Sequence, residues 1–464
     1  MKYFLFLIMA FGAFYNTHAQ NQQTLYQFDP QSNATAFQMN PAFIPAAKFT
    51  IGLPISQLNI QGRFGLKPTD IGTYDQETQT LNINANNYKI RSGEDFENRF
   101  SGNFTPIFIA YSNGKTAFSF SAGTRFYAQH QVSQSLIDLA INGNGFTEEE
   151  LAGGQYTKVT TGNISTSNIV YGQASMGFGR KIGERLTIGL KGSFLWGMYN
   201  VSTNDMSVTI ESDARANRNK VHSSDGVINT SNISDNSAHG DEILSAISPN
   251  GNYGVAIDLG INYQLTEKVT ISAVVKDMGA IQWDQQTEEI TFSKSAIDQN
   301  GIDLDRFLNI KSESDGSDVD FLEEVTDQFE EVLQLDSVQN KKHTATLPIR
   351  NMISIDYQLS KRHRVGLTSI NEFHQGSWNA GISTFYNFYL GSAFSMIVNW
   401  TAINNSYDNI GAGFRWNIGA VQLYMLTDNI LAPLRPHQTN NFALSTGINL
   451  QFGRKKMKVK NWED

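Results

Sequence analysis

The stretch 253–265, YGVAIDLGINYQL, decides the fold because its residues alternate in character with a period of two. Side chains of a β-strand point alternately to opposite faces, so this pattern predicts a strand with one apolar and one polar side. The apolar side comprises Tyr253, Val255, Ile257, Leu259, Ile261, Tyr263 and Leu265. The other side comprises Gly254, Ala256, Asp258, Gly260, Asn262 and Gln264.

The same alternation returns at 410–418 and at 442–452. Strands of about ten residues with one apolar side and aromatic ends suit a tilted strand that spans a membrane. In a soluble β-sandwich the strands are usually shorter, and the outer faces carry more Lys and Glu. Here Gly, Ser, Asn and Gln dominate the polar sides, which suits a watery lumen, and a secreted soluble β-protein is the alternative. The scattered charges on these sides are candidates for facing the lumen: Lys191, Asp258, Asp356 and Arg415.

The composition excludes several classes of protein. The chain has 464 residues, of which 17% are charged, and it contains 30 Phe, 17 Tyr and no Cys. Low charge with many aromatic residues argues against disorder. The lack of Cys excludes disulfide frameworks, thiolate zinc sites, Cys nucleophiles and a lipid anchor on an N-terminal Cys. A net charge of −9 speaks against general binding of nucleic acid, which selects basic surfaces.

Residues 1–19 have the organisation of a secretory signal peptide. Met1 and Lys2 precede an apolar run over 3–15, and the small residue Ala19 offers a cleavage site. A membrane helix, the alternative, needs about 20 apolar residues. We therefore expect export, followed either by a soluble state outside the inner membrane or by insertion into an outer membrane as a β-barrel.

Turn chemistry predicts an all-β, antiparallel transmembrane barrel of about 14 strands, because short and long connections alternate. Short connections are expected at 112–114, 181–184, 266–267, 360–363, 387–389 and 417–419, and long ones at 63–102, 130–168, 202–250, 283–346 and 428–440. The expected strands are 50–62, 103–112, 115–129, 168–181, 186–201, 252–265, 268–282, 347–359, 364–372, 378–387, 390–401, 409–418, 420–428 and 441–452, and 80–90 could add another. The sheet must close on itself, because the bilayer core offers no water to an unpaired backbone.

Residues 20–47 precede the first strand and include Asn40, Pro41, Ala42 and Phe43. Pro41 and Pro45 exclude a regular strand or helix interior there. We expect a compact segment in the barrel mouth, with these four residues as plug or gate candidates, and a loose periplasmic leader is the alternative. The barrel itself should span 48–453, followed by a basic periplasmic tail at 454–464.

The connection 283–346 is strongly acidic and is expected to be extracellular. Apolar residues recur at helical spacing within 321–333, which predicts an amphipathic helix that packs on barrel loops or docks a partner. The run 298–305 partly resembles a calcium loop, but Asn309 stands where the bidentate Glu is required. A solvated acidic loop is the better interpretation. The basic tail could contact anionic lipid or a partner, or it could simply fray.

Catalytic motifs are not apparent. None of the eight histidines stands in the zinc-protease spacing, and no Gly-x-Ser-x-Gly elbow occurs. The glycine-rich stretch 177–183 lies on a strand that ends in a tight turn, unlike a nucleotide loop that enters a helix. We expect no enzymatic activity, no catalytic residue, no cofactor and no metal site.

The element Asn40-Pro41-Ala42 resembles the N-terminal motif of the FadL-like channels, and the stretch 274–279, VVKDMG, is similar to another motif of that family. The resemblance implies a 14-stranded outer-membrane barrel with an N-terminal hatch that moves hydrophobic molecules. The chain is still more similar to an uncharacterised family of Bacteroidota outer-membrane barrels, a domain of unknown function. The shared features are Met39 with the Asn-Pro-Ala element, Asp428-Asn429 and the final stretch 447–450. Relatives of related architecture serve type IX secretion as partner barrels.

These observations lead to two functional expectations. The first is a FadL-like outer-membrane channel for passive uptake of a small hydrophobic molecule, gated by residues 20–47. The second is a non-transporting barrel subunit of an outer-membrane secretion or assembly complex. The expected partners are outer-membrane lipid, the hydrophobic molecule or a protein of such a complex.

Overall fold

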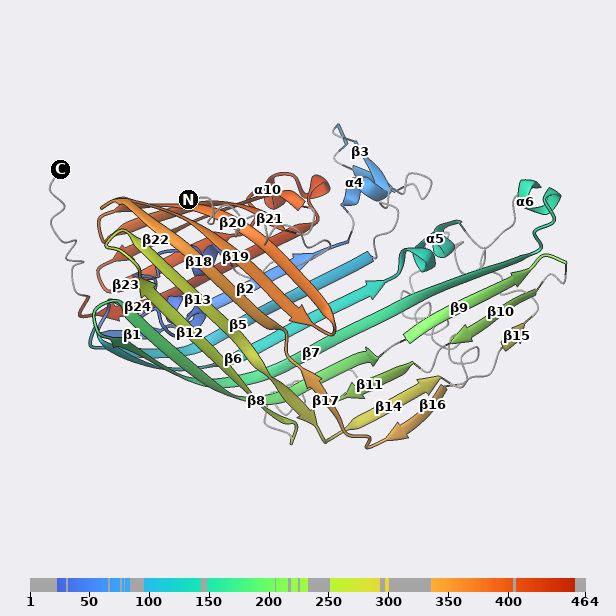
Figure 1. Cartoon of the computed structure of the whole chain (residues 1–464), viewed down its shortest axis with the longest axis horizontal. Helices are drawn as coiled ribbons and strands as arrows, with labels where there is room; N and C mark the ends of the chain where they lie inside the picture. Colours follow the sequence, from blue (N-terminus) through green and yellow to red (C-terminus); the bar gives the residue numbers. More distant parts are fainter. Residues whose placement is uncertain are drawn as a thin grey trace.

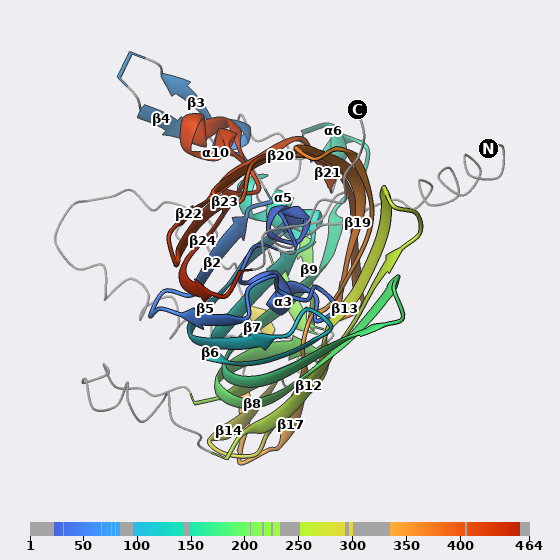
Figure 2. The same ribbon diagram turned by 90° about the vertical axis from the view of Figure 1, so that its left-hand side faces the viewer.

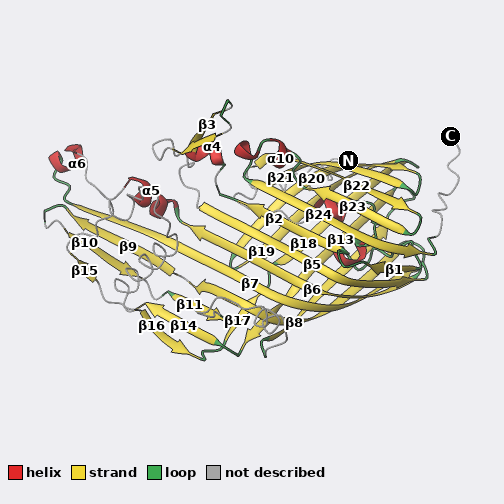
Figure 3. Cartoon of the chain, turned by 180° about the vertical axis from the view of Figure 1, so that it is seen from behind, coloured by secondary structure: helices red, strands yellow, loops and turns green. Residues whose placement is uncertain are grey.

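The structure is a computed structural model, and it describes residues 23–454 apart from 31, 66, 76, 79, 84–95, 143–147, 205, 216–217, 224–225, 233–250, 293–296, 300–334 and 404–405. Its main body is an antiparallel β-sheet that closes into a barrel (Figure 1). At one end the strands are joined by tight turns, and at the other end several strands run far beyond the barrel (Figures 1 and 3).

Fourteen strands make the wall when β1 and β2, which both pair with β24 and β5, are counted as one. Every other neighbouring pair is also antiparallel. The predicted 14-stranded antiparallel barrel is therefore confirmed. The wall comprises β1 (Phe49–Gly52) with β2 (Gln57–Arg63), β5 (Phe96–Ser112), β6 (Thr116–Val132), β7 (Thr157–Ile182), β8 (Leu186–Asn204), β12 (Tyr253–Gln264), β13 (Val269–Trp283), β18 (Ile349–Ser360), β19 (His363–His374), β20 (Ser377–Leu390), β21 (Phe394–Ile403), β22 (Ser406–Ile418), β23 (Val421–Thr427) and β24 (Asn441–Phe452).

The two faces of β12 differ as its sequence pattern predicts. Val255 is 65% exposed and Leu259 49% exposed on the outer face, whereas Ala256 is 2% exposed and Asp258 is fully buried on the inner face. Apolar side chains on the outside and polar ones on the inside reverse the arrangement of a soluble protein. A closed sheet with this apolar exterior is a barrel of the outer-membrane type.

Several strand boundaries differ from the prediction, for example at β5, which begins at Phe96 and not at 103, and two differences have a clear local cause. The first strand is broken into β1 and β2 around Pro54, whose nitrogen cannot donate to the ladder. The turn expected at 387–389 is wrong, because β20 continues to Leu390 and the chain reverses at Gly391. Gly391 has a φ of 63°, a backbone conformation that favours glycine, whereas the aromatic residues before it suit a strand.

The long outer connections contain more strand than predicted. The strand β7 has 26 residues and extends the sheet beyond the barrel (Figure 3), so the expected loop at 130–168 is partly wrong. The loops expected at 202–250 and 283–346 also contribute strands to this extension. These are β9 (Met206–Asp213), β10 (Arg218–Ser223), β11 (Val227–Ser231), β14 (Thr287–Phe292), β15 (Ile297–Gln299), β16 (Leu335–Gln339) and β17 (His343–Thr346).

Short elements complete the outer end of the molecule. They are α4 (Pro68–Ile71), the hairpin of β3 (Gly72–Asp75) and β4 (Thr80–Ile83), α5 (Gln134–Asn142), α6 (Glu148–Ala152), α10 (Leu431–Leu434) and the 3-10 turn η2 (Pro436–Gln438). The strand β4 pairs with β3 alone, so the part of 80–90 that is described adds no strand to the wall. No helix in the described part of the chain is long and apolar enough to cross a membrane.

Several predictions concern residues outside the described part of the chain. These are the signal peptide at 1–19, the amphipathic helix at 321–333, the calcium-like loop beyond Gln299 and the basic tail beyond Arg454.

Candidate functional site

Residues 23–47, here called the N-terminal segment, lie inside the ring of strands (Figure 2). The segment contains two short helices, α2 (Gln23–Gln27) and α3 (Ala36–Met39), whose residues are all buried. Its apolar side chains share one cluster with inward-facing wall residues. The cluster comprises Leu25, Tyr26, Phe28, Ala36, Met39 and Phe43 of the segment with Val274, Met352, Ile370, Phe385, Ile397, Tyr424 and Leu426 of the wall.

Tyr26 shows how completely water is excluded from this contact. Its hydroxyl lies 3.0 Å from Ser272 Oγ, and its ring centroid lies 5.3 Å from that of Phe43. Burial raises the pKa of the Tyr26 phenol well above its usual range, so the group stays neutral and acts through its hydrogen bond.

The first half of the segment is held by polar side chains of the wall. Asn399 Nδ2 donates hydrogen bonds to Thr24 Oγ1 at 2.9 Å and to Gln27 Oε1 at 2.8 Å. The Gln27 carbonyl accepts hydrogen bonds from Asn387 and from Arg364. A buried backbone carbonyl needs such partners, because leaving it unpaired is costly.

Two further contacts hold the middle of the segment. Arg415 NH2 lies 3.0 Å from Asp29 Oδ2, and both side chains are almost fully buried. Gln422 accepts a hydrogen bond from the Ala34 N–H and donates one to the Ser32 carbonyl, each at 2.8 Å. The amide of Gln422 thus takes the place of a neighbouring backbone for a stretch that has no regular structure.

The second half of the segment rests against glycines. An added Cβ at Gly260 would lie 2.0 Å from Asn40 Oδ1, and one at Gly189 would lie 2.1 Å from the carbonyl carbon of Pro41. At Gly179 it would lie 2.4 Å from the Pro41 carbonyl oxygen. Three neighbouring strands, β7, β8 and β12, therefore leave a notch that fits Asn40 and Pro41 and excludes any larger wall residue.

Asn40 also shapes the turn that follows it. Its Oδ1 accepts a hydrogen bond from the Ala42 N–H at 2.9 Å, and its Nδ2 donates to the Ala273 carbonyl at 3.1 Å. Of the four residues predicted as plug or gate, Asn40, Pro41 and Ala42 meet in this notch and turn. Phe43 instead joins the apolar cluster.

The four charges predicted to face the lumen all lie on the inner face, where each has an ion-pair partner. Lys191 pairs with Asp258, and Asp356 pairs with Arg364 at 3.4 Å. The partner of Arg415 is Asp29 of the N-terminal segment. The sequence pattern identified these inward positions, but it could not indicate that they are paired instead of hydrated.

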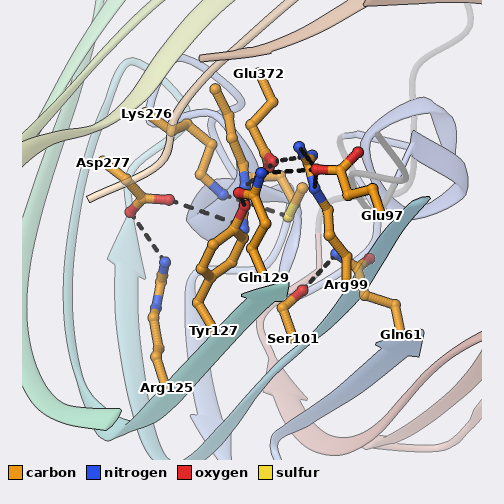
Figure 4. Close-up of polar contacts among 12 residues, drawn as sticks. Gln61, Glu97, Arg99, Ser101, Arg125, Tyr127, Gln129, Lys276, Asp277 and Glu372 are labelled. Atoms are coloured by element: carbon orange, nitrogen blue, oxygen red, sulfur yellow. Dashed lines mark hydrogen bonds and ion pairs between the residues drawn. The ribbon is translucent and has the colours of Figure 1, made fainter. Parts of the chain in front are cut away.

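A row of charges in the lumen was missed by the sequence analysis, and we call it the charged row (Figure 4). Arg99 NH1 lies 2.7 Å from Glu372 Oε1, and Arg350 Nε lies 2.8 Å from Glu372 Oε2. Arg350 NH1 is 3.8 Å from Asp277 Oδ2, and Arg125 NH1 is 2.9 Å from Asp277 Oδ1. Charged residues at inward positions of apolar strands were a usable signal for it. The complete row comprises Glu97, Arg99, Arg125, Asp277, Arg350 and Glu372.

A β-bulge aims Asp277 into this row. Opposite Asp258 on β12, the strand β13 carries two residues, Lys276 and Asp277, and both are buried. Asp277 has a φ of 60°, which is uncommon for a residue other than glycine, and its N–H donates to Asp258 Oδ1 at 2.9 Å. The Nζ of Lys276 lies 3.8 Å from Met39 Sδ, so the bulge also contacts the N-terminal segment.

Two small cavities lie beside the charged row. One borders Gln38, Arg125 and Lys191, and the other borders Arg99, Tyr127 and Glu372. Each has a volume of about 10 Å³, which is room for about one water molecule. Neither could hold a larger solute without movement of the surrounding side chains or of the N-terminal segment.

The barrel can be compared with solved structures. The toluene transporter TodX of Pseudomonas putida is 8% identical, with 90% of this chain and 91% of that chain covered and a TM-score of 0.37. A FadL homologue of Pseudomonas aeruginosa is 9% identical, with 90% and 94% covered and a TM-score of 0.38. The translocator domain of the autotransporter NalP of Neisseria meningitidis is 10% identical, with 87% and 88% covered and a TM-score of 0.30.

The sequence comparisons give a family. No curated protein sequence matches the chain. A family model described as a family of unknown function, DUF5723, matches residues 41–428, which is most of the chain. The chain therefore belongs to the DUF5723 family.

Proposed function

We propose that this outer-membrane barrel is a channel that the N-terminal segment closes, and that it takes up a small hydrophobic molecule passively when the segment moves. The burial of most described residues of the N-terminal segment inside the barrel is the observation that carries the proposal. In this proposal residues 1–19 direct export, 20–47 form the gate, 48–453 form the barrel, and 454–464 form a periplasmic tail. The barrel performs no catalysis.

The chemistry of the contacts supports a gate that can open. The first half of the segment is held by side-chain amides such as Asn399 and Gln422, and water can replace such hydrogen bonds at modest net cost. In the second half, Asn40 and Pro41 rest in a notch made by glycines, which holds them by shape. Movement of the segment would thus leave polar wall groups to be hydrated, which a watery lumen allows.

A hydrophobic cargo is supported by a second apolar cluster on the inner face of the wall. Tyr127, Ile169, Tyr171, Leu195, Ala256, Ile281, Trp283 and Leu347 form this cluster. Apolar linings with a few polar groups are typical of sites for small ligands. The motif resemblance at Asn40-Pro41-Ala42 points to the same class of cargo.

Deletion of residues 20–47 tests the gate. The barrel should still insert into liposomes, because the wall pairs without the segment, and the swelling rate of the liposomes in small neutral solutes should rise. An unchanged swelling rate with a correctly inserted barrel would count against gating by this segment.

A single methyl group offers a sharper test with a matched control on the same strand. Gly189→Ala on β8 should displace Pro41 and raise the swelling rate, although less than the deletion does. Gly192→Ala, three positions along, points outward and has no atom within 4 Å of the added carbon, so its rate should stay at the parental value. Equal rates for the two variants would contradict the role of the notch.

A non-transporting subunit of an outer-membrane secretion or assembly complex is the second candidate, and it is favoured by the sheet that β7, β9 and β10 extend beyond the barrel. Such a surface exceeds what a channel wall needs. Purification in mild detergent separates the candidates. A stoichiometric protein partner would support the subunit, and a lone barrel with a bound lipid-like molecule would support the channel.

A further inference from the structure

The charged row joins opposite walls of the barrel. Arg99 lies on β5 and Glu372 on β19. Six wall strands separate them in one direction (β6, β7, β8, β12, β13 and β18), and six separate them in the other (β20 to β24 and the β1–β2 strand). The 2.7 Å contact between their side chains therefore crosses the whole lumen.

A second connection crosses the lumen between two strands that lie closer together along the wall. Arg125 lies on β6 and Asp277 on β13, with β7, β8 and β12 between them along the wall. Arg350 on β18 joins the two connections, because it contacts both Glu372 and Asp277. The Tyr127 hydroxyl on β6 adds a contact of 3.4 Å to Glu372. Any solute that moves along the lumen must pass between these side chains or separate them.

Structural stability alone gives little reason for such a row. Buried ion pairs lose hydration that their attraction often only balances, and apolar replacements of similar volume are often as stable. The wall is already closed by its backbone ladder, so it needs no cross-brace at this point. The left-handed backbone at Asp277 is a further cost, and such outliers are concentrated at functional sites.

The composition of the row is balanced. Three guanidinium groups, from Arg99, Arg125 and Arg350, face three carboxylates, from Glu97, Asp277 and Glu372. Loss of one carboxylate leaves an excess positive charge in the row, and loss of one arginine leaves an excess negative charge. The sign of the excess charge determines which ions concentrate there.

We propose that the charged row is the selectivity constriction of the channel, distinct from the N-terminal segment, and that it admits neutral molecules while it discriminates ions by charge. This inference rests on the proposed channel function. Both closures lie side by side, because Lys276 next to Asp277 contacts Met39 of the segment. Displacement of the segment exposes the row, and the row then determines what passes.

The test measures reversal potentials in planar bilayers under a potassium chloride gradient, with the barrel that lacks residues 20–47. Glu372→Gln should shift the permeability ratio towards chloride and Arg350→Gln towards potassium, each about fivefold, as one unit charge a few ångströms from an ion in water would produce. The double variant should return to the parental ratio. Lys361→Gln, at an exposed turn, should not change the ratio.

The outcomes separate this inference from the gate. If the truncated barrel conducts and neither variant changes the ratio, or both change it in the same direction, the inference is overturned and the gate stands. If the truncated barrel does not conduct but Glu372→Gln restores conduction, the row is the closure and the gate proposal fails. If neither barrel conducts, both fail. The change in gel mobility on heating shows whether each variant has a folded barrel. The double variant keeps the net charge of the row, so it controls for the removal of side chains without a change of charge.

Discussion

The outer and inner faces of the same strands follow opposite rules. On the outer face of β12, side chains such as Ile257 and Ile261 are about half exposed, and their position does not call for a particular partner residue. On the inner face, Asp258 is fully buried, pairs with Lys191 and accepts a hydrogen bond from the Asp277 N–H. The medium outside is hydrocarbon, so apolar residues of many shapes suffice there, whereas each inner group depends on a particular partner.

This difference predicts that substitutions on the inner face lower the free energy of unfolding more than those on the outer face. It also predicts that a second substitution at the partner residue restores much of the loss. It also locates the functional groups, because only the inner face combines buried charge with the N-terminal segment. The following variants test the contrast between the two faces in order of expected effect.

Lys191→Met should have the largest effect. It leaves Asp258 buried without its paired cation, and breaking a buried pair in this way costs about 3–5 kcal/mol. The measurement is the free energy of unfolding in lipid vesicles with urea. The double variant with Asp258→Asn keeps an acceptor for the Asp277 N–H and should recover most of the loss. A single variant as stable as the parent would show that the inner pair is hydrated.

Val255→Arg should have the next largest effect. A charged side chain that faces lipid costs up to about 2–4 kcal/mol at the bilayer midplane and less towards the interfaces. Val159→Arg is the matched control, because Val159 is similarly exposed but lies on the part of β7 that pairs with β9 outside the barrel. The same unfolding measurement should show a small change for Val159→Arg. Equal losses at the two sites would contradict the lipid-facing assignment of Val255.

Asp428→Asn should have a smaller, pH-dependent effect at the rim of the inner face. Burial raises the pKa of Asp428, although the Thr24 N–H donates to its Oδ1 at 3.1 Å. The folded state thus binds the proton more tightly than the unfolded state, so this group lowers the free energy of unfolding as pH rises from about 4 through the raised pKa. The variant should match the parent in acid and be more stable at neutral pH.

Asp75 in the exposed β3–β4 hairpin provides the opposite case. Hydrogen bonds from the Glu77 and Thr78 N–H groups lower its pKa, so its contribution is present above the ordinary Asp pKa and is lost as pH falls through the lowered value. Asp75→Asn should therefore have a lower free energy of unfolding than the parent at neutral pH. The urea concentration at the midpoint of unfolding, measured in acid and at neutral pH, compares Asp75→Asn with Asp428→Asn. Identical pH profiles would contradict the buried state of Asp428.

Much of the barrel could be predicted from the sequence because its membrane part must alternate. For the segment 253–265, the predicted faces and the predicted ends agree closely with β12. The outer part of β7 could not be predicted in this way, because Thr157–Ile182 begins with a polar stretch. No lipid faces that part, so no apolar face is required, and the strand pattern disappears.

The candidate site was accessible to prediction only in part. Two prolines identified 40–45 as irregular, but the notch that receives Asn40 is made by three glycines on three strands. The inward positions of the charged row could have been read from the strand pattern, but its pairing could not, because Arg99 and Glu372 are 273 positions apart and meet only when the sheet closes. Closure, register and the bulge at Asp277 are properties of the whole barrel.

Spin labels along β12 test the central account most directly, because the chain contains no cysteine of its own. Single cysteines at positions 255, 256, 257, 259, 261 and 262 would carry the labels in a barrel reconstituted in lipid, since 254, 258 and 260 are closely packed or paired. The account predicts a period of two. Labels at 255, 257, 259 and 261 should collide freely with oxygen dissolved in the lipid, and those at 256 and 262 should not. Labels at the odd positions that are immobile and shielded from oxygen would contradict it, because they would lie in a packed protein interior.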